Sequence, residues 1–254
     1  MKANRKNRIW AVLGTVAILI GIKAAYANSN LEGTWLISKP QTLLQPADGS
    51  AVPFTEAGRK TYEQNKTAAQ SGDFAFDGTM TRCSSPGIPR LMLSPKRFKI
   101  FDRPGKVLFL FEWNRLFRQI DMRDDATIEN SKALEGTENF AFDLYGLENT
   151  VGAQVGHARG HWEGRTLVAE TDHFVDYKMF DGLIQTSDQL KLTERVRLKD
   201  RDTLEYRVTI VDPATFTKPW DVVLTYKRQP DAPFQEDICM ERKKAGESPW
   251  PKPL

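Results

Sequence analysis

The sequence predicts a mainly β protein, an antiparallel barrel or sandwich with one short helix. Many short segments carry apolar residues at strand spacing, and turns such as Pro104-Gly105 and Glu163-Gly164 join several of them into hairpins. One stretch, after Thr55, has the start signal of a helix. Short strands with few helices are typical of a barrel or sandwich, and a barrel of about eight to ten strands can hold one small ligand.

The expected strands run through most of the chain. They cover residues 31–35, 98–101, 106–114, 116–122, 155–162, 165–172, 190–198, 203–211 and 221–228. The strand at 203–211 alternates cleanly, with Leu204, Tyr206, Val208 and Ile210 on one side. Residues 106–114 are apolar at both parities, which predicts a strand buried on both faces.

The remaining segments are assigned by their turn and cap residues. Thr55 is the expected N-cap of a helix that runs to about Gln70, and 71–89 is expected to be a loop containing Cys83. Asp212-Pro213 and Lys218-Pro219-Trp220 indicate turn chemistry and packing. The end of the chain is rich in proline, and we expect a mobile C-terminal tail.

The first 27 residues have the pattern of a secretory signal peptide. A basic start is followed by an apolar run over 9–22 and by Ala25-Tyr26-Ala27. The run of about 14 residues is shorter than the roughly 20 that span a bilayer, although an uncleaved anchor is the alternative. We therefore expect a signal peptide over 1–27, one barrel domain over 28–254, and a periplasmic protein without stable membrane insertion.

Removing the leader changes the charge of the chain. The full sequence has 36 basic and 33 acidic residues, and the leader contains five basic residues and no acidic one. The mature chain therefore has 31 basic against 33 acidic residues, a net charge of −2. Because no basic patch interleaved with aromatic residues remains, we expect no nucleic-acid partner.

Cys83 and Cys239 are the two cysteines of the chain. Export would place them in an oxidising compartment, where a disulfide persists, so we predict a bridge between them; two free buried thiols are the alternative. Neither belongs to a C-x-x-C motif, so redox or zinc chemistry is not indicated.

The mature chain resembles a family of exported bacterial proteins with a lipocalin-like barrel. The residues that carry the resemblance are 31–35 (LEGTW), 53–58 (PFTEAG), Cys83 with 86–90 (PGIPR), 111–114 (FEWN) with Arg118, Gly156-His157, Gly160 with 162–164 (WEG), Glu194-Arg195, Asp212-Pro213 and 217–220 (TKPW). The resemblance implies a lipocalin-like (calycin-type) fold and an association with lyases that release formaldehyde from lignin-derived aromatics. The chain departs from the family pattern at His161, where Arg is expected, and near His173.

The three histidines fall within one predicted hairpin. His157 and His161 share a parity, and a Glu163-Gly164 turn would set His157 opposite Glu170, with His173 on the other side. Histidine suits proton transfer near neutral pH, so His157 is a candidate acid or base. Structural histidines are the alternative. A metal site is a third interpretation, but H-x-x-x-H on a strand separates the rings by roughly 13 Å, and we expect no metal.

Glu194 lies on the apolar parity of its strand, with Leu190, Leu192, Val196 and Leu198. A carboxylate on a core face must be paired or protonated. Either an arginine neutralises Glu194 in a structural pair, or Glu194 is a general acid or base in a pocket of low dielectric.

Glu112 is a second buried candidate, in a run that is apolar on both sides. Asn114 and Arg118 are expected beside it. Arg118 would either neutralise Glu112 or bind a substrate oxygen, and Arg90, after a Pro-Gly-Ile-Pro turn, would be a loop anchor or a substrate clamp. We therefore name His157, Glu194 and Glu112 as catalytic candidates, and Arg118, Arg90 and Asn114 as substrate-binding candidates.

The chain lacks the G-x-S-x-G, P-loop and G-x-G-x-x-G patterns, which disfavours serine hydrolases, kinases and nicotinamide enzymes. We expect a cofactor-independent lyase or isomerase for a small aromatic molecule, working by acid/base chemistry such as C–C cleavage or elimination. The formaldehyde-releasing version rests on the resemblance. The alternative is a periplasmic carrier of a small hydrophobic ligand. Self-association is left open.

Cleavage of the leader is directly testable. The exported protein should begin at Asn28, because Ala25 and Ala27 are the small residues that signal peptidase selects. Intact mass spectrometry of the protein from the periplasmic fraction checks this. A mass that includes residues 1–27 would instead indicate a retained anchor.

Overall fold

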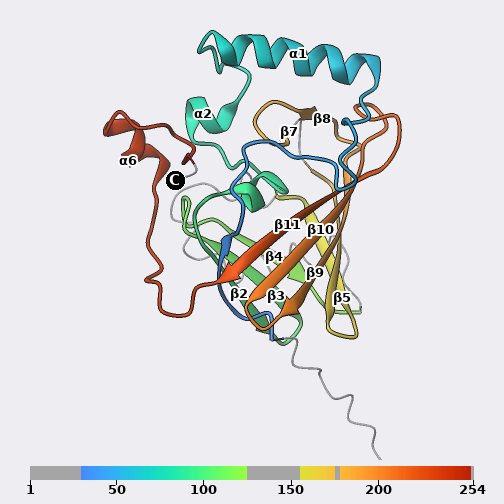
Figure 1. Ribbon diagram of the computed structural model, residues 1–254, viewed down its shortest axis with the longest axis vertical. Helices are drawn as coiled ribbons and strands as arrows, with labels where there is room; N and C mark the ends of the chain where they lie inside the picture. The colour runs from blue at the N-terminus through green and yellow to red at the C-terminus, as the bar shows by residue number, and fades with distance from the viewer. Residues whose placement is uncertain (1–29, 125–154, 175–177, 253–254) are drawn as a thin grey trace, which may run out of the picture.

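A closed nine-stranded barrel forms the body of the protein, as predicted (Figure 1). The computed structural model describes residues 30–124, 155–174 and 178–252, so the expected leader lies outside the described residues. The barrel strands are β1 (Gly33–Ile37), β2 (Phe98–Arg103), β3 (Lys106–Phe111), β4 (Phe117–Asp121), β5 (His157–Glu163), β6 (Thr166–Asp172), β9 (Lys191–Asp200), β10 (Thr203–Val211) and β11 (Trp220–Arg228). Around the barrel their order is β1-β11-β10-β9-β6-β5-β4-β3-β2.

The wall is antiparallel except at one seam. β4 and β5 are parallel, and the register between them consists of the pair Asp121↔Arg159. The neighbouring β5–β6 ladder pairs seven residues from each strand. Because ladder hydrogen bonds hold a sheet together, the β4–β5 seam is the weakest join in the described wall.

Strand alternation sends one face of each strand into the barrel. Leu204, Tyr206, Val208 and Ile210 of β10 are buried, which confirms their predicted common side. The prediction that 106–114 is buried on both faces is wrong. β3 ends at Phe111, and its burial alternates, with Leu108 and Leu110 only partly covered, because a barrel wall has one enclosed face.

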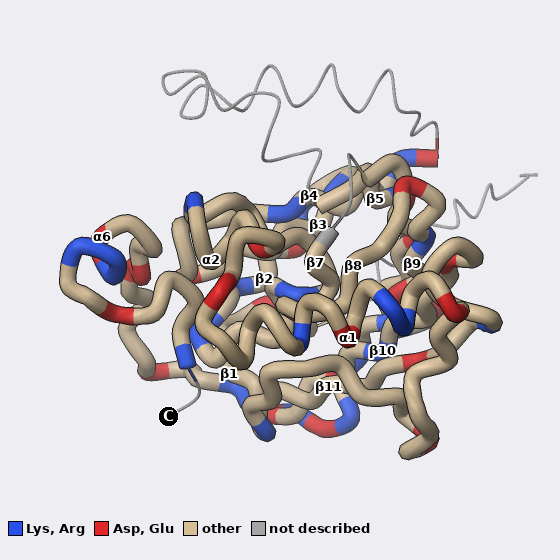
Figure 2. The backbone as a smooth tube through the Cα atoms, turned by 90° about the horizontal axis from the view of Figure 1, so that it is seen from above, with Lys and Arg blue, Asp and Glu red and all other residues tan. Residues whose placement is uncertain are grey.

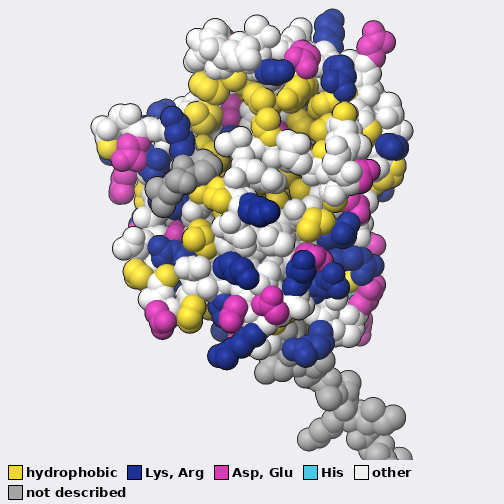
Figure 3. Space-filling model, viewed as in Figure 1, with side chains coloured by type: hydrophobic (Ala, Val, Ile, Leu, Met, Phe, Trp, Pro, Cys, Tyr) yellow, Lys and Arg dark blue, Asp and Glu magenta, His cyan; other side chains and the backbone are white. Residues whose placement is uncertain are grey.

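Helix α1 (Glu56–Gln70) begins at the predicted N-cap, where Thr55 Oγ1 accepts a hydrogen bond from the Gly58 amide at 3.0 Å. The helix lies across one end of the barrel, as the view from above shows (Figure 2). Hydrophobic side chains gather directly beneath it (Figure 3). A Cβ on Gly58 would lie 2.4 Å from the Thr215 carbonyl oxygen, so only glycine permits this approach.

Several short elements were not predicted. The expected loop at 71–89 contains α2 (Gly78–Arg82), which forms because the Asp77 carboxylate accepts a hydrogen bond from the Thr79 amide. It is followed by the 3₁₀ turn η1 (Arg90–Leu93). The short strands β7 (Lys178–Met179) and β8 (Gln185–Thr186) pair with each other, and α6 (Cys239–Lys244) lies near the end of the chain.

The predicted register of the histidine hairpin is wrong. Glu163 pairs with Thr166, so the turn is Gly164-Arg165, and His157 lies opposite Asp172 rather than Glu170. Gly164 takes the first turn position, where its φ of +59° suits glycine. Glu163 remains in the strand, where its carboxylate pairs with Arg195 at 2.6 Å.

The predicted disulfide between Cys83 and Cys239 is present, with the two Cα atoms 5.8 Å apart. It ties the segment after α2 to the start of α6. The expected C-terminal tail runs outside the barrel and packs Trp250 against Trp113, with ring centroids 5.1 Å apart. The mobility of the tail stays a prediction. Among the described residues, no helix is both long enough and apolar enough to cross a bilayer.

Replacing both cysteines, Cys83→Ala with Cys239→Ala, should lower the free energy of unfolding by about 2–5 kcal/mol, since the bridge restricts a long loop of the unfolded chain. Urea denaturation of the variant and of the oxidised parent checks this. Reduced parent protein is the control and should match the variant. An unchanged urea midpoint would mean that the tail is held by its other contacts alone.

Candidate functional site

Four buried polar side chains meet inside the barrel. Arg118 Nη1 lies 2.5 Å from Glu194 Oε2 and forms an ion pair with it, although the angles are not those of a hydrogen bond. Arg118 Nη2 donates a hydrogen bond to Thr171 Oγ1 at 2.7 Å. The Tyr206 hydroxyl donates to Glu194 Oε1 at 3.0 Å. The side chain of Glu194 is 0% exposed and that of Arg118 is 1% exposed. We call these four residues the lumen cluster.

Small residues allow Arg118 to reach Glu194. Arg118 belongs to β4 and Glu194 to β9, and β5 and β6 lie between these strands. The inward positions of the two intervening strands include Ala158, Gly160 and Ala169, and Ala169 pairs directly with Glu194. A long guanidinium side chain can therefore extend across their inner surface.

Aromatic side chains surround the lumen cluster. Phe109 is the direct cross-strand partner of Arg118 and stacks on Phe98, with centroids 5.8 Å apart. Tyr226, which is fully buried, packs edge-on against Phe98 and donates its hydroxyl to the Met92 carbonyl oxygen at 2.8 Å. The lumen thus combines aromatic walls with one charged pair.

The environment keeps Tyr206 protonated. Burial raises the pKa of the Tyr206 phenol well above its usual value, and the negative charge of Glu194 adds to this rise. A neutral phenol donates a hydrogen bond, and this one points at a carboxylate. The lumen cluster therefore contains one cation, one anion and two neutral hydroxyl groups.

The histidine candidate lies apart from this cluster. His157 shares the outer parity of β5 with Arg159, and Asp172 faces it across the ladder. Burial lowers the pKa of His157, and the positive charge of Arg159 lowers it further. Neither ring nitrogen has a hydrogen-bond partner within the part of the chain that the structure describes. The structure does not bring His157 together with Glu194, because inward and outward residues of a strand point to opposite faces.

The other two histidines are exposed. His161 lies 3.4 Å from a carboxylate oxygen of Glu163, and His173 lies 2.8 Å from one of Asp172. Within the described part of the chain, no three His, Cys, Asp or Glu side chains converge as metal ligands.

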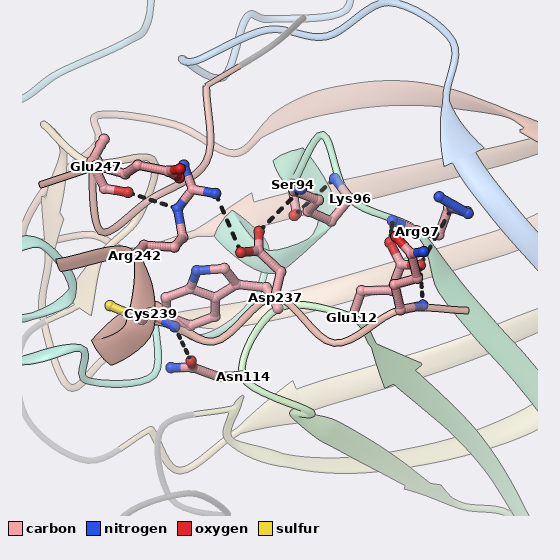
Figure 4. A network of polar contacts seen from close by, with 12 residues as sticks. Ser94, Lys96, Arg97, Glu112, Asn114, Asp237, Cys239, Arg242 and Glu247 are labelled. Atoms are coloured by element: carbon pink, nitrogen blue, oxygen red, sulfur yellow. Dashed lines mark hydrogen bonds and ion pairs between the residues drawn. The ribbon is translucent and has the colours of Figure 1, made fainter. Parts of the chain in front are cut away.

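Glu112 binds the tail rather than Arg118. Its carboxylate accepts hydrogen bonds from the backbone amides of Arg97 (2.9 Å) and Gln235 (2.8 Å) and pairs with the Arg97 guanidinium (3.3 Å) (Figure 4). The prediction that Arg118 lies beside Glu112 is wrong, because Arg118 points into the barrel and Glu112 lies under the tail.

Asn114 and Asp237 complete this attachment. Asn114 Oδ1 accepts a hydrogen bond from the Cys239 amide at 2.7 Å, next to the disulfide. Asp237 pairs with Lys96 at 3.3 Å and with Arg242 at 3.2 Å (Figure 4). These contacts hold the tail against the barrel wall, so Glu112 and Asn114 have structural roles in this arrangement.

Arg90 takes the loop-anchor position that the sequence left open. Its guanidinium forms two hydrogen bonds to the Asp77 carboxylate, at 3.0 and 2.8 Å, and both side chains are buried. Trp250 of the tail lies against the guanidinium. The distance from the guanidinium carbon of Arg90 to the centroid of the Trp250 ring is 5.2 Å. Asp212 is likewise structural, as predicted, since its carboxylate accepts hydrogen bonds from Ser187 and Thr215.

Two surface clefts lined by described residues lie away from these candidates. One of about 450 Å³ separates α1 from residues 185–188, and one of about 400 Å³ lies beside Arg207 and Lys218. Neither is lined by a residue of the lumen cluster. The cluster remains the strongest candidate site among the described residues, because it combines charge, burial and hydrogen-bond donors.

Sequence reasoning missed Tyr206 and Thr171 as members of the cluster. The inward parity of Tyr206 was evident, and the β9–β10 register places it diagonally beside Glu194. That hairpin register was the signal that would have found it. No protein-family model matches the chain, and no curated protein shows significant similarity to it.

The lumen pair can be tested by stability. Glu194→Gln should lower the free energy of unfolding by about 3–5 kcal/mol, because it leaves Arg118 as a buried, uncompensated cation. Combining Arg118→Met with Glu194→Leu should restore stability to the parent level or above it, since apolar residues remove both desolvation costs. Chemical denaturation of the single and double variants measures both effects.

Glu163→Gln is the matched control. It removes an exposed carboxylate that also pairs with an arginine, Arg195, and should change stability little. If Glu194→Gln were as mild as this control, the ion pair in the lumen would not be held as described.

Proposed function

We propose that this protein is an exported lipocalin-like barrel that acts as a cofactor-independent lyase on a small aromatic molecule. The observation that carries the proposal is the Arg118–Glu194 pair enclosed among aromatic side chains in the lumen. Taking two charges out of water costs several kcal/mol per ion, and apolar residues often fill such space at lower cost. A charged pair in this position therefore supports a chemical role.

Glu194 is the proposed base. Its two carboxylate oxygens have about four lone-pair positions. Tyr206 uses one on Oε1 through a hydrogen bond, and Arg118 pairs with Oε2 without hydrogen-bond angles. A remaining position can accept a proton from a substrate hydroxyl. Arg118 is the proposed stabiliser of negative charge on a substrate oxygen, acting in a site of low dielectric.

The proposed reaction is a retro-aldol cleavage of a hydroxymethyl group. Glu194 takes the hydroxyl proton, the oxygen forms the C=O of formaldehyde, and the C–C bond breaks. The electron pair of that bond stays with the aromatic fragment and is delocalised onto the oxygen held by Arg118. The same proton then returns from Glu194 to carbon, which releases the product and restores the carboxylate.

Entry to the lumen is assigned to the seam between β4 and β5. Arg118 lies three residues before Asp121, which forms the one pair of the described seam. Segments with few ladder hydrogen bonds open at the lowest free energy. Export to the periplasm is part of the proposal, supported by the sequence of 1–27 and by the disulfide.

A carrier is the second candidate function. Both oxygens of Glu194 are already engaged, by Arg118 and Tyr206, and such a neutralised pair can orient a ligand without reacting with it. In this alternative the same lumen binds a small hydrophobic or aromatic molecule and releases it unchanged.

Incubation of mature protein, residues 28–254, with hydroxymethyl-bearing aromatic dimers distinguishes the two functions. EDTA is present and no cofactor is added. A lyase should produce formaldehyde and a product lighter by about 30 Da, the mass of CH₂O, and Glu194→Gln should lower kcat by about 10²-fold or more through loss of the base. Mass spectrometry and a formaldehyde assay read the outcome.

His157→Ala is the matched control, since His157 lies on the outer face and should be dispensable for turnover. Loss of turnover in this variant would contradict the assignment of Glu194 as the base that works without histidine. Unchanged compounds that raise the melting temperature would support the carrier and exclude the lyase.

A further inference from the structure

Arg118 has a donor that no described residue uses. A guanidinium has five N–H groups in a planar fork. Nη2 donates to Thr171, and Nη1 lies against Glu194 in an ion pair without hydrogen-bond angles. Among the described residues, the buried Nε has neither a hydrogen-bond partner nor an ion-pair partner. A buried donor without an acceptor is costly, so this edge of the guanidinium suits a ligand oxygen.

The charge of the lumen cluster limits which oxygen can bind there. Arg118 and Glu194 balance each other, and Tyr206 is neutral because its phenol pKa is raised by burial. A carboxylate or phenolate ligand would leave a net negative charge enclosed among aromatic side chains. Enclosing an unbalanced charge is far more costly than enclosing a neutral carbonyl group.

The net charge of the lumen cluster also stays balanced during the proposed reaction. When Glu194 accepts a proton it becomes neutral, and the developing enolate takes over as the partner of Arg118. The enclosed charge remains balanced from substrate to intermediate. A carbonyl oxygen that becomes negative only as the bond breaks also gains its strongest interaction with Arg118 at that point, which favours the transition state over the substrate.

We propose that the lumen selects a neutral aryl ketone, with its carbonyl oxygen on Arg118 Nε and its ring beside Phe109. Phe109 is the cross-strand neighbour of Arg118, and its ring stacks on Phe98. This inference rests on the proposed function and names its substrate class as a β-hydroxymethyl aryl ketone. It excludes aromatic acids as substrates.

Binding of three matched probes tests the selection. The probes are 4-methoxyacetophenone, 4-methoxybenzoate and 4-ethylanisole, which share a ring and differ in the polar group. Calorimetry on the mature parent protein should show the ketone binding about tenfold or more tightly than the other two, corresponding to one well-made hydrogen bond without an added charge. Equal affinities, tighter binding of the benzoate, or no binding at all would overturn the inference.

Glu194→Gln should reverse this preference. The variant cluster has a net positive charge, so 4-methoxybenzoate should become the tightest of the three probes. Glu163→Gln, which removes a carboxylate outside the barrel, should keep the parent order. If Glu194→Gln does not fold, the comparison of the three probes on parent protein still decides the question.

The location of binding has its own readout. The Arg118 Nε–H resonance, assigned through its absence in Arg118→Lys, should shift when the ketone is added. A ketone that binds without moving this resonance would place the site elsewhere and overturn the inference. Selective ketone binding with no formaldehyde from any β-hydroxymethyl ketone would instead contradict the lyase alone and leave the selected ligand class intact.

Discussion

The buried pair between Arg118 and Glu194 is the constraint on which the lumen depends. It requires a long side chain from β4 to reach β9, and so it requires small inward residues on the strands between them, among them Ala158 and Ala169. It also requires further hydrogen-bond partners, because such contacts offset part of the cost of burying two charges. Thr171 accepts a hydrogen bond from Arg118, and Tyr206 donates one to Glu194. The identity of several neighbouring residues thus follows from one ion pair.

A second set of contacts closes the molecule around this interior. Arg90 joins the N-cap residue of α2 to the tail, through Asp77 on one side and Trp250 on the other. Glu112 joins the wall to the tail a short distance away. In both cases the buried charge pairs with a side chain or with backbone amides of another segment, and the contact holds two parts of the chain together. The lumen cluster is also buried and charged, but its contacts lie inside the barrel and fasten no tail to the wall.

Strand alternation made the barrel and the inward position of Glu194 predictable, because a period of two identifies which side chains share a face. It could not identify the partner of Glu194. Arg118 comes from a strand two places away in the barrel, and that contact depends on closure of the whole sheet. The cross-strand partner of His157 was predicted wrongly for a local reason. A turn placed one residue early shifted the pairing by two residues, so its partner across the ladder changed from Glu170 to Asp172 on the same face of the hairpin. The neighbours of Glu112 were predicted wrongly because the tail that covers it comes from the far end of the chain.

The lyase and the carrier share the lumen cluster and differ in what the carboxylate does there. For a carrier, the pair is a fixed dipole, and an apolar replacement of both charges would weaken ligand orientation but leave binding of the ring. For a lyase, the pair must exchange partners: Glu194 gives up its charge to a proton while Arg118 transfers its interaction to the substrate oxygen. Tyr206 bears on the choice between them, because its neutral phenol donates a hydrogen bond to Oε1 of the carboxylate. A catalytic Glu194 therefore requires the enolate and Arg118 together to outweigh that hydrogen bond. An aryl ketone meets this requirement better than an alkene or an ether, since its oxygen receives the negative charge directly.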